Sequence, residues 1–167
     1  MLELRPATYD HPDAALLVAA VQREYVERYG GEDATPVDPA EFAPPLGYFT
    51  IGYVEGDPVA CGGWRIRGAE PGEPLRDGDV EIKRMFVRES HRRLGYARAV
   101  LAELEQTAAA AGRRRAVLET GTRQPEAIAL YTSAGYRPAA RFGYYREAPG
   151  CRCFAKLLIP ARSRLTT

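Results

Sequence analysis

The sequence predicts a mixed α/β sandwich in which helices cover a central sheet. Two observations carry this prediction: β-rich runs alternate with segments of helical periodicity, and the helical segments end at glycines. The chain of 167 residues is long enough to bury one core and too short for two ordinary domains. Its 46% hydrophobic and 27% charged residues are typical of a globular domain rather than of a disordered chain.

The expected elements follow one another with clear turn signals between them. Residues 31–46 hold four prolines and are expected to form a loop with at most one short helix. Glu55-Gly56-Asp57 joins two β-rich runs and is typical of a hairpin turn. In chain order we expect a strand at 2–7, a helix at 12–29, a hairpin at 47–54 and 58–66, a strand at 80–87, a helix at 94–111, a strand at 115–120, a helix at 125–134, and strands at 136–142 and 152–159.

The strand that follows the hairpin carries an irregularity. Val80 and Ile82 share one parity, whereas Met85 and Val87 share the other, so a regular strand would point the two pairs at opposite faces. One extra residue near Lys83-Arg84 would place all four side chains on one face, which predicts a β-bulge there. The alternative is a strand buried on both faces, which tolerates either parity.

Charge and composition exclude several classes of function. The 23 basic and 22 acidic residues give a net charge of +1, so nothing favours a nucleic acid or an anionic membrane as a partner. No apolar run approaches the roughly 20 residues of a membrane-spanning helix. The N-terminus lacks an apolar segment of signal-peptide length, so we expect a cytoplasmic protein.

The cysteines are expected to be reduced thiols in that compartment. The sequence has three cysteines, Cys61, Cys151 and Cys153. An odd number of cysteines argues against a disulfide framework. A structural zinc site needs four soft ligands. The two histidines, His11 and His91, lie far in sequence from the Cys-x-Cys pair, so we expect no metal site.

The segment from Arg88 to Arg98 predicts an anion-binding turn. It opens the helix expected at 94–111, and a helix N-terminus offers unpaired N–H groups and the positive end of the helix dipole. Gly95 would let a ligand approach the backbone closely, and the neighbouring arginines add positive charge, so a pyrophosphate would fit. The spacing matches neither a nucleoside-triphosphate loop nor a dinucleotide fingerprint. A solvent-exposed, arginine-rich helix start is the alternative.

Two motifs resemble those of the GNAT superfamily of N-acetyltransferases. Arg92-x-x-Gly95-x-Ala97 after an apolar strand is similar to the family's Arg/Gln-x-x-Gly-x-Gly/Ala motif, and Ala127-Ile128-Ala129-Leu130-Tyr131 with Gly135-Tyr136 is similar to its second conserved stretch. The resemblance implies a mixed sheet of six to seven strands flanked by about four helices, with a β-bulge and splayed strands that form the acyl-CoA cleft. It also implies one acetyltransferase domain at residues 1–159, followed by a short tail at 160–167.

The resemblance implies acetyl-CoA as the co-substrate. The pyrophosphate would lie on the turn that opens the long helix, while the backbone of the bulged strand would pair with the pantetheine arm. The implied binding residues are Met85, Phe86, Val87, Arg92, Arg93, Leu94, Gly95, Tyr96, Ala97, Arg98 and Tyr131. Gln124 stands where the family often has an asparagine that touches the pantetheine or an ordered water, so a longer amide either replaces this contact or loses it.

Two residues match catalytic positions of the family. Tyr131 matches a tyrosine that donates a proton to the departing CoA thiolate, and the alternative is a ring that only packs under the sheet. Glu81 matches, by its distance ahead of Arg92, the strand glutamate that histone-type members use to deprotonate the amine. The alternative for Glu81 is a strand residue that is paired with Lys83 or Arg67.

The sequence therefore predicts an N-acetyltransferase that moves an acetyl group from acetyl-CoA to a primary amine of a small molecule in a ternary complex. An acyl-CoA-binding module of the same fold with little catalysis is the alternative, and neither a nucleic acid nor a membrane is expected as a partner. The resemblance implies that the acceptor lies between loops 30–46 and 142–151, near side chains such as Asp33, Tyr48 and Tyr145. The alternative for the charged loop is a merely solvated segment. A homodimer stays open, because the apolar run at 154–159 fits either a neighbouring chain or the sheet interior.

Overall fold

The computed structural model describes residues 1–159, and the tail expected at 160–167 lies outside the described residues. Within that range the chain forms three α-helices, two short 3₁₀-helices and seven strands. The helices are α1 (Pro12–Tyr29), α2 (Tyr96–Ala110) and α3 (Pro125–Ser133), with the 3₁₀-helices η1 (Pro39–Phe42) and η2 (Glu89–His91). The strands are β1 (Glu3–Pro6), β2 (Gly47–Val54), β3 (Asp57–Ile66), β4 (Asp79–Val87), β5 (Arg115–Gly121), β6 (Arg137–Ala139) and β7 (Cys151–Leu157).

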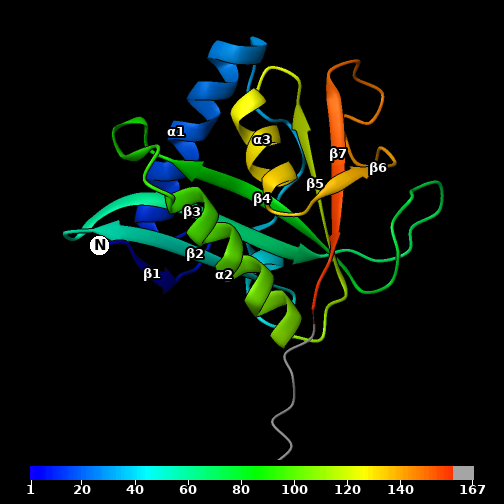
Figure 1. Ribbon diagram of the computed structural model, residues 1–167, viewed down its shortest axis with the longest axis horizontal. Helices are drawn as coiled ribbons and strands as arrows, with labels where there is room; N and C mark the ends of the chain where they lie inside the picture. Colours follow the sequence, from blue (N-terminus) through cyan, green and yellow to red (C-terminus); the bar gives the residue numbers. More distant parts are fainter. Residues whose placement is uncertain (160–167) are drawn as a thin grey trace, which may run out of the picture.

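All the strands of the described chain belong to one sheet, in the order β1-β2-β3-β4-β5-β7-β6 (Figure 1). Neighbouring strands are antiparallel except β4 and β5, which are parallel. Helix α1 packs on one face, whereas α2 and α3 pack on the other, and their buried side chains enter separate core clusters. The mixed α/β sandwich is thus confirmed. The apolar run that begins at Phe154 enters β7, which pairs with both β5 and β6, whereas its residues Leu157 and Ile159 are exposed.

The family resemblance implied about four helices, whereas the described residues form three α-helices. The proline-rich segment between α1 and β2 forms only η1, which begins at Pro39 after an Asp38 capping box. Pro44 and Pro45 follow it and have no N–H group, so they cannot extend the helical hydrogen bonding. No helix within residues 1–159 combines the length and the apolar character needed to cross a membrane.

Two of the differences from the predicted element boundaries have local reasons. Helix α2 begins at Tyr96 rather than at residue 94, because Gly95 takes a left-handed conformation (φ 81°) at the N-cap. Strand β6 is limited to Arg137–Ala139, where 136–142 was expected. Pro138 has no N–H to donate to the ladder, and Phe142 packs instead into a third cluster of buried side chains.

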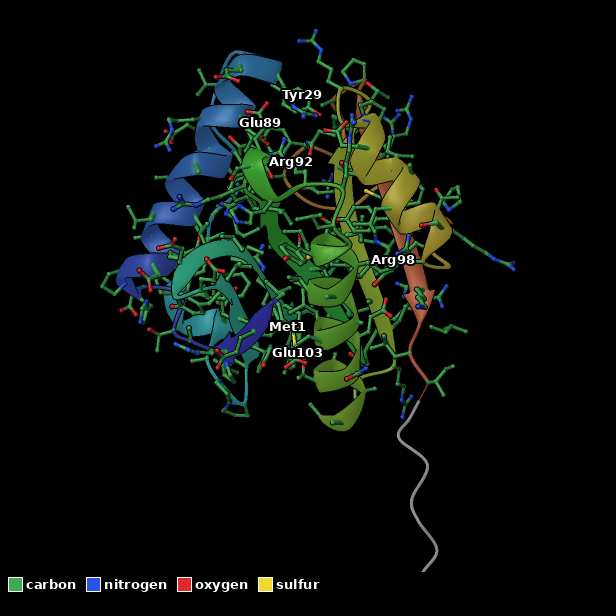
Figure 2. The ribbon with its side chains drawn as sticks, turned by 60° about the vertical axis from the view of Figure 1, so that its left-hand side comes forward. Met1, Tyr29, Glu89, Arg92, Arg98 and Glu103 are labelled. Atoms are coloured by element: carbon green, nitrogen blue, oxygen red, sulfur yellow. The ribbon has the colours of Figure 1, made fainter. Side chains whose placement is uncertain are left out.

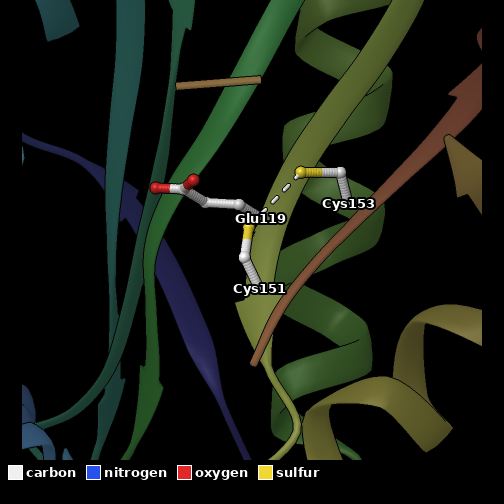
Figure 3. Close-up of side chains that lie close together, drawn as sticks. All are labelled: Glu119, Cys151 and Cys153. Carbon is white, nitrogen blue, oxygen red and sulfur yellow. Dashed lines mark hydrogen bonds between the residues drawn. The ribbon is translucent and has the colours of Figure 1, made fainter. Parts of the chain in front are cut away.

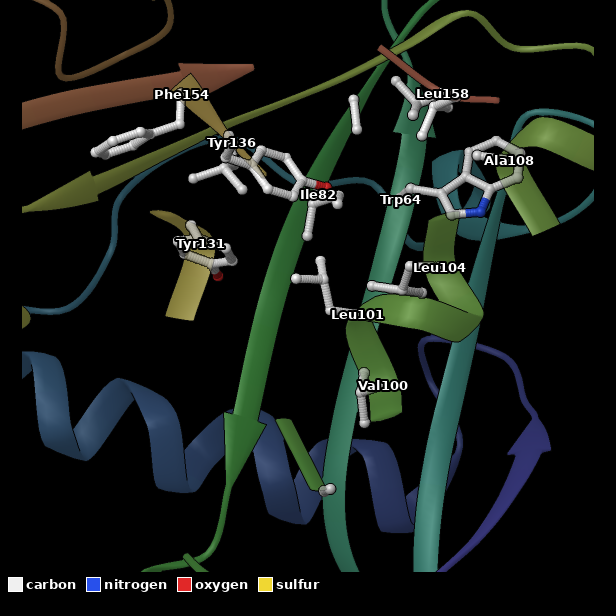
Figure 4. Close-up of a cluster of buried hydrophobic side chains, with 14 of the residues drawn as sticks. Trp64, Ile82, Val100, Leu101, Leu104, Ala108, Tyr131, Tyr136, Phe154 and Leu158 are labelled. Carbon is white, nitrogen blue, oxygen red and sulfur yellow. The ribbon is translucent and has the colours of Figure 1, made fainter. Parts of the chain in front are cut away.

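The largest cluster of buried side chains lies between the sheet and helices α2 and α3 (Figure 4). Leu104 of α2 is fully buried there, near Trp64 of β3. The Trp64 indole Nε1–H donates a hydrogen bond of 2.9 Å to Thr107 Oγ1, so the polar atom of this ring is satisfied inside the core. Helix α2 is therefore held against the sheet by both apolar packing and a buried hydrogen bond.

Leu104→Ala is expected to lower the free energy of unfolding by about 2–5 kcal/mol, because the lost isobutyl group leaves a cavity in a close-packed cluster. Urea denaturation followed by circular dichroism measures this change. Leu157→Ala is the control, since Leu157 is 72% exposed on β7 and its truncation should change stability by less than about 0.5 kcal/mol. Equal losses in the two variants would contradict the placement of Leu104 in the core.

The β-bulge predicted in the middle of β4 is present. The register of β3 and β4 shifts between the pairs Gly63–Lys83 and Cys61–Phe86, so two β4 residues stand opposite one β3 residue. Arg84, inside the bulge, adopts a left-handed φ of 58°. As a result, four apolar side chains of β4 contact the cluster under α2 and α3: Val80, Ile82, Met85 and Val87.

Candidate active site

Strands β4 and β5 start side by side and then diverge (Figure 1). Their parallel ladder holds only at the start of each strand and ends at the pair Glu81–Val117. Beyond Glu81, β4 stays paired with β3 but has no partner on the β5 side. This free backbone edge, from Ile82 onward, carries the predicted residues Met85, Phe86 and Val87, and it can offer hydrogen bonds to an extended ligand.

A row of free N–H groups lies where β4 leads into α2. The backbone N–H groups from Arg93 to Arg98, which include those of Leu94, Gly95, Tyr96 and Ala97, donate to no acceptor among the described residues. Arg93 (φ 65°) and Gly95 (φ 81°) both have left-handed conformations, and such kinks gather successive N–H groups into an anion-binding concavity. Together with the α2 dipole, this turn has the donors that a pyrophosphate needs.

The arginine side chains of this turn point in different directions (Figure 2). Arg92 points toward α1: its Nε donates to Val87 O over 2.9 Å, and its guanidinium pairs with Glu24. Arg98 points toward α3 and donates to Ser133 Oγ over 2.6 Å. Arg93 is exposed. The guanidinium of Arg92 therefore fixes the turn to α1, and Arg93 and Arg98 are the cations left to face an anion.

Tyr131 lies on α3, in the cluster between the helices and the sheet. Its side chain is buried, and its ring makes an edge contact with Tyr136 at a centroid distance of 5.7 Å. The Tyr136 hydroxyl donates to Glu105 Oε2 over 2.9 Å, whereas that of Tyr131 has no partner among the described side chains. Burial raises the pKa of Tyr131 well above its usual value, so this phenol keeps its proton and is available as a donor.

Glu81 is buried in a network of cations on the opposite face of the sheet. Its Oε1 accepts hydrogen bonds from Arg65 Nε at 3.0 Å and from Arg67 Nη1 at 2.9 Å. Its Oε2 lies 4.0 Å from Lys83 Nζ. The carboxylate thus pairs with Arg67 and Lys83, the partners that the sequence analysis named as the alternative to a role as base. Its Oε1 is already occupied by two charged hydrogen bonds.

Glu119 is a functional candidate that sequence reasoning missed. It lies on β5 just beyond the last β4–β5 pair, and its Oε1 is 3.8 Å from Lys83 Nζ across the gap between the strands. Its Oε2 is buried and accepts no hydrogen bond from the described residues. Burial raises the pKa of Glu119 to about 7, although Lys83 opposes this shift. The available signal was an acidic residue within an expected strand, since Glu119 directly follows the apolar run Ala116-Val117-Leu118.

The two loops expected to border the acceptor do meet on this face. The Tyr145 hydroxyl, from the loop before β7, accepts a hydrogen bond of 2.7 Å from Ala34 N, in the loop after α1. Asp33 pairs with Lys83 and Arg84. Burial acts against the ionisation of Asp33, but these cations and hydrogen bonds from Thr35 outweigh it and hold the pKa of this carboxyl below its usual range.

Two further predicted residues have partners that change their interpretation. Tyr48 does not border the acceptor side, because its hydroxyl donates to Glu103 Oε1 of α2, on the other face of the sheet, over 2.8 Å. Gln124, at the N-cap of α3, donates from Nε2 to the Tyr29 hydroxyl over 3.1 Å. Its amide thus ties α3 to α1 at the open end of the splayed strands.

The sequence matches a known family over most of its length. The family model described as acetyltransferase (GNAT) family matches residues 15–136. The chain belongs to this family. A curated protein of Azospirillum brasilense named IAA acetyltransferase is 32% identical over 133 residues, which make up 80% of this chain and 82% of the relative.

Solved structures of GNAT proteins share the fold. A Klebsiella pneumoniae protein assigned to the acyl-CoA N-acyltransferases is 26% identical, with a TM-score of 0.76 over 95% of this chain and 99% of that chain. A GNAT family acetyltransferase from Elizabethkingia anophelis, solved with acetyl-CoA bound, is 16% identical, with a TM-score of 0.65 over 94% and 98% of the two chains. The predicted GNAT fold and the acetyltransferase class are therefore confirmed.

Proposed function

We propose that this acetyltransferase moves the acetyl group of acetyl-CoA to a primary amine of a small molecule, within one domain formed by residues 1–159. The observation that carries the proposal is the free edge of β4 running into the row of N–H groups from Arg93 to Arg98. A pantetheine arm would pair with the strand edge, and the pyrophosphate would accept the N–H bonds. The thioester would then lie in the gap between β4 and β5, with Tyr131 on the α2/α3 side.

In the transfer, the amine nitrogen attacks the thioester carbonyl carbon, a C–N bond forms and the C–S bond breaks. A backbone N–H of the β4 edge would stabilise the oxyanion that forms on the carbonyl oxygen. The nitrogen loses one proton to a general base, and the sulfur, which leaves with the bonding electron pair, receives the proton of the Tyr131 phenol. Tyr131 and the base thus act from opposite faces of the sheet.

The proposed base is Glu119, with Glu81 as the second candidate. Glu119 lies at the gap and has a buried oxygen that no described residue uses, so this oxygen is available to a proton. Glu81 is held by Arg65 and Arg67, and a proton placed on it would disrupt these ion pairs. The amine would approach between the loops that contain Asp33 and Tyr145.

The experiment that tests this function first is a thermal-shift titration with acetyl-CoA, free CoA and ATP. Acetyl-CoA at a hundred times its dissociation constant should add about 2.7 kcal/mol of stability, and each kcal/mol should raise Tm by about 2–4 °C for a chain of this size. ATP, which shares the adenine nucleotide but has no pantetheine, should give a much smaller rise. No rise with either CoA compound at millimolar concentration would contradict the proposal.

Turnover then separates the enzyme from a binding module. Release of free CoA thiol is followed with a thiol reagent over a panel of primary amines. IAA is tested beside them, because the Azospirillum relative is named IAA acetyltransferase. An acceptor that raises thiol release well above the hydrolysis background supports the proposal. Binding of acetyl-CoA without turnover over the whole panel would favour the binding module instead.

A further inference from the structure

We propose that Glu119, Cys151 and Cys153 form a binding site for one zinc ion on the acceptor face of the sheet. The three residues come from neighbouring antiparallel strands, and Glu119 of β5 stands directly opposite Cys153 of β7 in the register. Cys151 lies two residues earlier on β7, so its side chain leaves the strand on the same side as that of Cys153. Figure 3 shows the two thiols side by side with the Glu119 side chain next to them, its carboxylate turned away from the sulfurs.

The spacing of the two thiols fits a metal ion. Cys151 Sγ and Cys153 Sγ are 3.9 Å apart, and two thiolates on a tetrahedral zinc ion at about 2.3 Å lie about 3.8 Å from each other. A disulfide would need the sulfurs to approach to about 2.05 Å, and the rigid strand would have to distort to allow it. The ligand atoms of all three residues lie within 4.8 Å of one another, so small side-chain rotations bring the carboxylate into reach as well.

The surroundings leave these ligand atoms available. Glu119 Oε2 is buried with no hydrogen-bond partner in the described chain, and the strongest contact of Cys153 besides Cys151 is a 4.0 Å approach to Phe142 O. Bound zinc would be held by two thiolates and one carboxylate, with Lys83 nearby to balance the remaining negative charge. The sequence excluded a four-ligand structural site, whereas the fold supplies three ligands, the number that leaves one position open to water.

The site has a consequence that rests on the proposed function. Zinc ligation would occupy the oxygen of Glu119 that we assign to the base, so a metal-loaded enzyme would bind acetyl-CoA but transfer the acetyl group slowly. Tyr131 and the pyrophosphate turn belong to the other face and to the helix N-terminus, so they would not be disturbed. The thiols would thus make acetyl transfer sensitive to thiophilic metal ions.

The test is a metal titration of the full chain, stripped of metal with a chelator and kept reduced. Zinc, titrated in competition with a chromophoric chelator, is expected to bind at one equivalent. Cys151→Ser and Cys153→Ser should each weaken binding by about tenfold or more. Cys61→Ser is the matched control, because Cys61 is a buried thiol of β3 that donates to Arg84 O away from this cluster, and its removal should leave zinc affinity unchanged.

A second measurement needs no variant that might misfold. Cobalt added to the wild-type chain should produce thiolate-to-metal charge-transfer absorption at one equivalent, and zinc should displace it. Absence of this absorption, zinc affinity weaker than millimolar, or serine variants that bind zinc as the wild type does would each overturn the site. Zinc should also lower turnover of the wild type, and a chelator should restore it. A failed function shows as no turnover in the metal-free chain, which is distinct from a failed metal site.

Discussion

Tyr131→Phe is expected to lower kcat by about 100-fold or more, because general acid catalysis contributes roughly 10²–10⁴-fold and the variant removes only the donated proton. The phenylalanine ring keeps the edge contact with Tyr136 and fills the same buried volume. Acetyl-CoA affinity should therefore stay within about twofold of the wild-type value. Steady-state kinetics and the acetyl-CoA thermal shift measure the two quantities separately, and the loss in kcat should be largest at high pH, where solvent protons are scarce.

Tyr136→Phe is the matched control for this prediction. Tyr136 is a second buried tyrosine of the same cluster, but its hydroxyl already donates its proton to Glu105 Oε2. Its loss should cost about 1 kcal/mol of stability from the hydrogen bond and leave kcat close to that of the wild type. If Tyr131→Phe retained full kcat at saturating acceptor, the thiolate would take its proton elsewhere and Tyr131 would have no part in the transfer.

Local patterns predicted the elements of this fold well. The parity change between Ile82 and Met85 predicted the bulge of β4. Side chains alternate between the two faces of a strand, so only an extra residue can keep both of these apolar side chains on the same buried face. The glycine that ends α1, Gly30, acts through its own left-handed conformation, so a single residue is enough to predict this helix end. Prolines account for the missing fourth helix and weaken β6, since each lacks an N–H group, whereas Gly95 delays the start of α2.

The details of the site depend on contacts between distant segments, and these could not be predicted. Arg92 was expected beside a pyrophosphate, but its guanidinium pairs with Glu24, a residue 68 positions away on α1. Glu119 became a functional candidate because it lies near Lys83 of β4 and near the two cysteines of β7. Only the order of the strands in the sheet brings these residues together. Spacing along one segment carries no information on such neighbours, whereas the N–H row at the start of α2 is local and was predicted.

Glu119→Gln is expected to lower kcat by about 100-fold with little change in stability. The amide has nearly the shape of the carboxylate but cannot take a proton from the amine. The variant loses no hydrogen bond at Oε2, which is without a partner among residues 1–159, and it gives up only the 3.8 Å ion pair of Oε1 with Lys83. Kinetics at saturating acceptor and urea denaturation of the same preparation measure both effects.

Glu81→Gln should give the opposite result, and it completes the comparison. This change leaves Arg65 and Arg67 without their buried anion, which should cost about 3 kcal/mol or more of stability, while kcat of the folded fraction stays within about tenfold of the wild-type value. A large loss of kcat in Glu81→Gln, with a fully active Glu119→Gln, would return the role of base to Glu81. The two carboxylates share only Lys83 as an ion-pair partner, and Glu119, whose Oε2 has no partner among the described residues, is the one that can carry a proton through the reaction.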